Sequence, residues 1–177
     1  MDENSAVAAI VTVIEDASST LVSGLDQNGQ ERVIEYISPT LLHLPSAYYG
    51  INVHCERATE RRSPEFVNSA EASPHATEYD MAVVVFENAL PDDGNDTFFC
   101  EVAHQNFRDL CDAVVKLLRR THKWLPSSVA TPRYRIKDDS ESPGRSVQKE
   151  NHLPEPSDEG LILASTIRFK LVGCNDG

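Results

Sequence analysis

The sequence lacks the short motifs that most readily identify catalytic and cofactor-binding sites. It contains no glycine-rich phosphate-binding loop, no Gly-x-Ser-x-Gly nucleophile motif and no His-Glu-x-x-His zinc motif. Its cysteines form no Cys-x-x-Cys pair, because they are widely spaced at Cys55, Cys100, Cys111 and Cys174, which argues against a structural zinc site. We therefore expect reduced cysteines with a structural role, no bound metal or cofactor, and a protein that is not an enzyme.

Long apolar runs and positive charge are also scarce. No stretch is long and apolar enough to span a membrane, and residues 1–4 are too acidic to open a secretory signal. The 28 acidic and 16 basic residues give a formal net charge of -12. This charge argues against a protein that wraps nucleic acid, which requires Lys and Arg, but it suits a surface that DNA slides past without binding. We expect no membrane contact and assembly in a cytoplasm.

Helical periodicity marks two segments of what we expect to be a single domain, residues 1–177. Apolar residues of the first segment recur at the spacing of one helix face, at Val7, Ile10, Val11 and Ile14. The second segment, 107–118, has the same spacing over three turns and ends in a basic run, which suits a helix C-terminus. We expect one helix at each position.

Strand-like patterns occupy much of the remaining chain. Residues 51–56 alternate between apolar and polar side chains. Residues 79–86 form a second strand pattern, and its run 81–86 is apolar on both faces, as in a central strand. Residues 133–137 and 161–172 also alternate, and residues 33–37 have the composition of a short strand. We therefore predict an α+β fold: an antiparallel or mixed sheet of about four strands with both helices packed on one face.

A long polar segment, 138–159, interrupts this pattern before the last strand. It is broken by Pro143, Gly144, Pro154 and Pro156, and it holds too little apolar surface to fold alone. We predict that it is a protruding hairpin loop, an extended arm or a disordered segment. Loops of this length within a domain are usually functional or become ordered on a partner.

Several residues resemble parts of chemical sites without completing one. His54 and Cys55 are neighbours on a predicted strand, so their side chains point to opposite faces. The acidic run 92–96 lacks the bidentate Glu of a calcium loop, and it reads better as a turn. Glu101 and His104 have no second pair of ligands nearby, so we expect surface hydrogen bonding there.

Basic residues cluster at the ends of the predicted strands, and we expect them to form a subunit or partner interface. These residues are Arg57, Arg61, Arg62, Arg133, Arg135, Lys137, Arg168 and Lys170. Two interpretations are open: they are solvated strand ends, or they meet the acidic face of a neighbouring copy. Charge pairing of the second kind sets register and partner choice more than raw affinity.

The order of these segments resembles that of the tail terminator, or tail completion, proteins of long-tailed bacteriophages. The matching parts are the helix 7–14, the strand pair 51–56 and 79–86, the helix 107–118 and the terminal strand 161–172. The resemblance lies in layout, size and acidity and includes no motif, so it assigns no site residue.

The resemblance implies a structural virion protein of the tail or neck. Such a protein forms a hexameric ring that caps the tail tube protein, stops its polymerisation and joins it to the head-side connector. DNA passes through the ring without specific binding, which agrees with the acidic composition. The long segment 138–159 departs from the family pattern, and we expect it to reach a neighbouring subunit or the tail tube.

Two alternatives stay open from the sequence. A head-closure or connector adaptor of the neck would share the acidity and the ring. A small α+β enzyme or ligand-binding domain would instead have a polar pocket between the helix 107–118 and the sheet.

Overall fold

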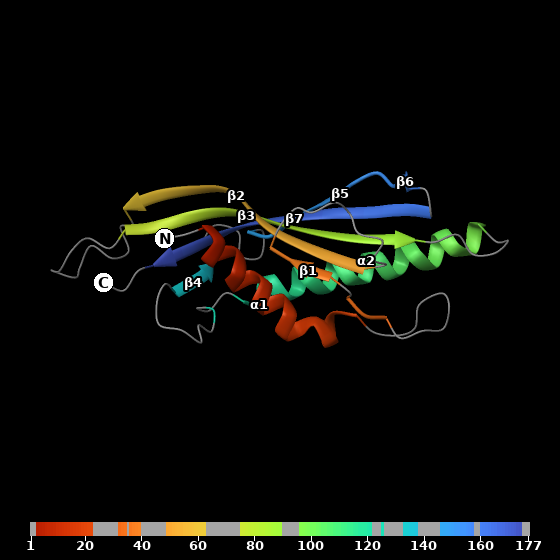
Figure 1. The fold of residues 1–177 in the computed structure, drawn as a ribbon, viewed down its shortest axis with the longest axis horizontal. Coiled ribbons are helices and arrows are strands. Elements are labelled where there is room, and N and C mark those ends of the chain that lie inside the picture. Colours follow the sequence, from red (N-terminus) through yellow and green to blue (C-terminus); the bar gives the residue numbers. More distant parts are fainter. Residues whose placement is uncertain are drawn as a thin grey trace.

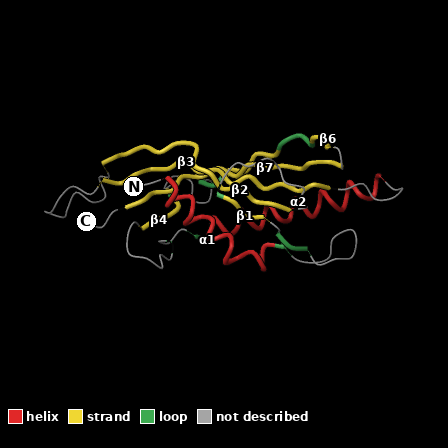
Figure 2. Tube along the Cα trace, in the orientation of Figure 1, coloured by secondary structure: helices red, strands yellow, loops and turns green. Residues whose placement is uncertain are grey.

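The computed structural model describes residues 3–22, 32–34, 36–39, 49–62, 75–89, 96–121, 125, 133–137, 146–157 and 160–174. In these residues a mixed sheet is covered on one face by two helices, as Figures 1 and 2 show. The predicted α+β class is therefore confirmed. Among the same residues, no helix is both long and apolar enough to cross a membrane.

The described sheet has seven strands in the order β1-β2-β3-β7-β4, and β5 and β6 also pair with β7. The long central strands are β2 (Tyr49–Arg62), β3 (His75–Ala89) and β7 (Gly160–Cys174). The short strands are β1 (Tyr36–Ser38), β4 (Arg133–Ile136), β5 (Gln148–Asn151) and β6 (Glu155–Ser157). Among the described strands, only β1 runs parallel to its neighbour, β2, and the other pairs are antiparallel.

Both helices form where the apolar periodicity predicts them. Helix α1 (Glu3–Leu21) buries Ile10 and Ile14, and helix α2 (Asp96–Arg120) buries Leu110 and Leu118. The two helices contact each other and the central strands, so they share one face of the sheet. Their apolar stripes close a single core.

Register determines which side chains of the sheet enter that core. Val53 lies opposite Val83, which lies opposite Ile167, and all three are fully buried in the core. Burying one such side chain stabilises the fold by about 1.5–3 kcal/mol. Because successive residues of a strand point to opposite faces, the intervening residues form a second face without helices.

The described sheet has seven strands, where the sequence predicted about four, and two of the additional strands come from the polar segment 138–159, which pairs with β7. β5 and β6 lie along the same edge of β7 as β4, and His152 continues the pairing through a backbone hydrogen bond to Ala164. All β5 side chains are exposed. Backbone pairing on an open sheet edge requires no apolar side chain, so hydrophobic periodicity could not reveal these strands. Residues 138–145, the first part of the predicted loop, lie outside the described residues.

On the helix-free face, Phe86 packs directly over Gly50, its partner across β2 and β3. A Cβ atom added at Gly50 would lie 2.0 Å from the ring of Phe86. Phe86 is 1% exposed, although it does not belong to the core under the helices. The missing side chain of Gly50 therefore makes the space that the aromatic ring occupies.

We predict that Gly50→Ala lowers the free energy of unfolding by about 1–3 kcal/mol, because the new methyl group overpacks this site. Urea denaturation of Gly50→Ala, Phe86→Leu and the double variant measures the effect. A smaller Leu side chain should relieve the clash, so the double variant should be more stable than the sum of the single changes indicates. If the unfolding free energies lost by the two single variants simply add up in the double variant, the proposed packing is wrong.

Candidate functional site

The helix-free face carries charged side chains from neighbouring strands. Arg57 lies opposite Asp80, and Asp80 lies opposite Lys170, so the three form one row across β2, β3 and β7. Arg168 stands in the next row on β7. We use the name charged face for this row and its charged neighbours: Glu56, Arg57, Glu78, Asp80, Lys137, Glu150, Arg168 and Lys170.

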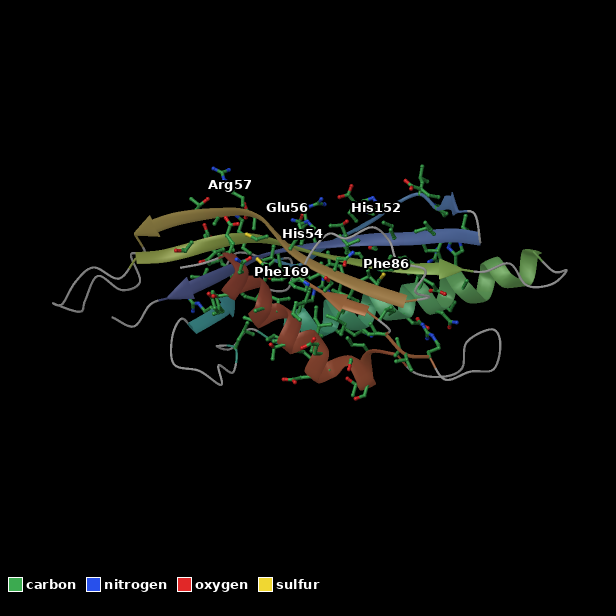
Figure 3. All side chains as sticks on the ribbon, viewed as in Figure 1. His54, Glu56, Arg57, Phe86, His152 and Phe169 are labelled. Carbon is green, nitrogen blue, oxygen red and sulfur yellow. The ribbon has the colours of Figure 1, made fainter. Side chains whose placement is uncertain are left out.

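A β-bulge places two charges side by side on β2. Cys55 pairs with Met81 and Arg57 with Asp80, so Glu56 is an extra residue between them. In such a bulge two residues oppose one on the partner strand. Figure 3 shows Glu56 and Arg57 on the side of the sheet that faces away from the helices. The irregularity thus adds a carboxylate beside the guanidinium of Arg57.

Ion pairs connect the strands across this face. Arg168 donates to Glu56 at 3.1 Å and to Glu150 at 2.6 Å, and these hydrogen bonds raise the pKa of its guanidinium. Lys170 lies 3.3 Å from Asp80, and Lys137 pairs with Glu78. The pairs of Arg168 and Lys170 are solvent-exposed and contribute at most about 1 kcal/mol each. They organise the face more than they stabilise the fold.

Arg57 differs from the other cations of the charged face. Among the described residues its side chain has no hydrogen-bond or ion-pair partner, although Glu56 and Asp80 are its neighbours. Its side chain is exposed at the bulge. As far as the described residues extend, Arg57 is therefore the cation of the charged face that can accept a partner from outside the chain.

A surface pocket of about 370 Å³ opens at this position. Its charged lining consists of Glu56, Arg57, Asp80, Arg168 and Lys170. Ser146 and Gln148 line it from the segment that follows residues 138–145, and Met81 and Phe169 form its apolar part. This volume is near the lower end for small-molecule sites, and it can accommodate one or two side chains of a partner. Three cations and two carboxylates in this lining suit a partner surface with charged side chains.

Two buried polar atoms lie further along the same face of β2. The Asn52 Oδ1 and His54 Nδ1 atoms have no hydrogen-bond partner in the ranges that the structure describes. Burial lowers the pKa of His54, Arg168 lowers it further, and Glu56 acts in the opposite direction. A second histidine, His152, hydrogen-bonds through Nε2 to the Thr166 hydroxyl at 2.7 Å. The polar part of the face thus extends beyond the pocket.

The structure brings part of the predicted basic interface together. Arg57, Arg168 and Lys170 line the same pocket, and Lys137 joins the charged face through Glu78. Arg135 lies on β4, is partly buried and interacts with other groups of the chain. The other three predicted residues occupy strand positions whose side chains lie outside the described part: Arg61, Arg62 and Arg133.

Sequence reasoning missed the carboxylates that organise these cations. Glu56 was expected at the end of a regular strand, Asp80 within an apolar one, and Glu150 in a polar loop. The bulge has no signature in the local sequence, and the contact of Arg168 with Glu56 joins residues 112 positions apart. Opposite charges on adjacent strands could have indicated these carboxylates. Matching one charge to another across strands, however, requires the register, which the sequence does not give.

The cysteine chemistry considered from the sequence does not arise at the described cysteines. Cys55 packs against the core while its neighbour His54 belongs to the polar face, so their expected divergence is confirmed. Burial raises the pKa of Cys111 to about 12, so its thiol stays protonated and unreactive. No group of three potential metal ligands occurs in the described ranges, which leave out residues 92–95 of the acidic turn.

No protein-family model matches the chain, and no curated protein matches it in sequence. The candidate site therefore depends on the charged face and its pocket, and the candidate function on these together with the order of the elements.

We predict that His54 makes the fold less stable in mild acid. Because its pKa is lowered in the folded chain, the unfolded chain binds more protons below the ordinary histidine pKa of about 6.5, and stability falls as the pH falls through that range. His54→Gln should flatten this decline between about pH 7 and 5, as measured by denaturant unfolding at each pH. His104→Gln is the control. If stability falls just as steeply in the His54 variant, the loss of stability in mild acid does not come from His54.

Proposed function

We propose that the chain is a structural virion protein that forms a hexameric ring, caps the phage tail tube and joins it to the head-side connector. The main support is the open charged face, which lies on the side of the sheet opposite both helices. A subunit of this shape can meet a neighbour through two different sides, as a ring requires. The resemblance in element order to tail terminator proteins favours this kind of ring over other assemblies.

The edge formed by β5 and β6 offers a further means of assembly. All four β5 residues are exposed, and Leu153, between β5 and β6, is 86% exposed. An open edge can pair with a strand of another chain. Pro154 and Pro156 limit such pairing, because proline has no backbone N–H to donate. We propose that this edge contacts a defined partner, such as the tail tube protein.

The acidity of the chain is consistent with the proposed location in the tail. With a net charge of -12, the subunit repels the phosphate backbone, so DNA would pass through the ring without specific binding. We propose that the ring is assembled in the host cytoplasm and remains in the virion between tail and head.

We predict that the purified chain assembles into a closed ring, alone or on addition of tail tube protein. Native mass spectrometry gives the number of subunits, for which we expect six, and negative-stain imaging shows whether the assembly is closed. The measurement should be repeated at two salt concentrations, because contacts between exposed charges weaken with ionic strength. A chain that stays monomeric even with tail tube protein present would rule out the proposal.

We also predict that residues 138–145 contribute to assembly and not to folding. The chain leaves the sheet at Lys137, opposite Lys170, and returns at Gln148, opposite Arg168, so a short Gly-Ser linker can join these ends. This replacement should leave the thermal midpoint nearly unchanged and weaken ring formation. β5 and β6 should be kept, because they belong to the sheet. A collapsed fold or unaffected assembly would contradict the prediction.

A further inference from the structure

We propose that the Glu15–Asp16 part of helix α1 in one subunit docks on the charged face of a second copy, at the pocket beside Arg57. This inference depends on the proposed ring, and it names the contact that would hold neighbouring subunits together. It accounts for an acidic set and a basic set of exposed charges that lie on opposite sides of the molecule.

The first set is acidic and lies on α1. The helix contains no Lys or Arg, and its carboxylates, Glu3, Glu15 and Asp16, are all exposed. None of the three has an ion-pair partner among the described residues. The chain has no basic residue before Arg32, so no nearby cation in the sequence offsets this charge. The outer side of α1 therefore carries negative charge alone.

The second set is basic and lies in the pocket. Arg57 has no partner in the described part of the chain, and Arg168 and Lys170 stand beside it. Although Arg168 and Lys170 already contact carboxylates, each has several N–H donors and can be shared with an incoming acid. A pocket of about 370 Å³ has room for two carboxylate side chains. The partner that suits it is a surface with exposed acidic residues and no cations.

The two surfaces lie on opposite sides of the subunit, so a contact between them does not join identical patches. Helix α1 covers one side of the sheet, and the labelled side chain of Arg57 points away on the other side (Figure 3). Two α1 surfaces would repel each other, because both are acidic. Contact between α1 of one copy and the charged face of the next is head-to-tail, and head-to-tail contacts produce rings when the rotation closes.

Charge reversal on each side tests this contact. Arg57→Glu alters the charged face, and the double variant Glu15→Lys, Asp16→Lys alters α1; all three residues are exposed, so we expect unchanged thermal midpoints. Each variant alone should assemble about tenfold more weakly than the wild-type chain, because like charges then meet. Arg108→Glu, an equal charge change on the exposed side of α2, should assemble normally.

Mixing the two defective variants gives the decisive result. In a head-to-tail assembly, the reversed charged face of one variant meets the reversed α1 of the other, and the remaining contact is wild type. Assembly should therefore recover only in the mixture, with the two variants alternating in equal numbers, as native mass spectrometry can detect.

The outcomes separate this contact from the ring itself. Rings that form normally with either variant would overturn the α1 contact and leave the proposed function standing. A mixture that assembles no better than its components would also overturn the contact. A wild-type chain that stays monomeric with tail tube protein present would overturn both.

Discussion

The structure depends on the pairing of β7 with β3 along nearly their whole lengths. β3 connects β7 to β2, and the other edge of β7 holds β4, β5 and β6. Since every pairing fixes which residues share a face, this central pair positions both the core and the charged face. A slip of one residue between the two strands would exchange the buried row of Ile167 with the charged row of Arg168.

The two faces of the sheet contribute very differently to stability. On the helix side, fully buried residues such as Val83 and Ile167 remove apolar surface from water, which is the main force for folding. On the other side, Arg168 and Lys170 are exposed and form pairs that stabilise little. The fold would survive without these charges, so stability does not explain why they converge on one pocket.

The sequence was sufficient to predict the helices and strands that bury an apolar stripe. It was insufficient to predict the strands that do not. Periodicity predicted α1, α2 and the central strands, because their positions follow from side chains that must leave water. β5 and β6 were missed because the edge of β7 supplies their backbone partners. The candidate site needs Glu56, Asp80 and Arg168 together, and these meet only through the register and a bulge. Of the predicted basic residues, three were brought into one pocket.

The two sides of the subunit differ in charge, and this difference limits how copies of the chain can meet. A two-fold contact pairs a patch with itself, and an α1 surface with carboxylates and no cations is poorly suited to that. The charged face, where cations and carboxylates alternate, can instead select a partner by position as well as by sign. Because such exposed contacts are individually weak and screened by salt, they suit an assembly in which many equivalent contacts close together. A ring built from small acidic subunits requires contacts of this kind, each weak alone and stable only when all of them form together.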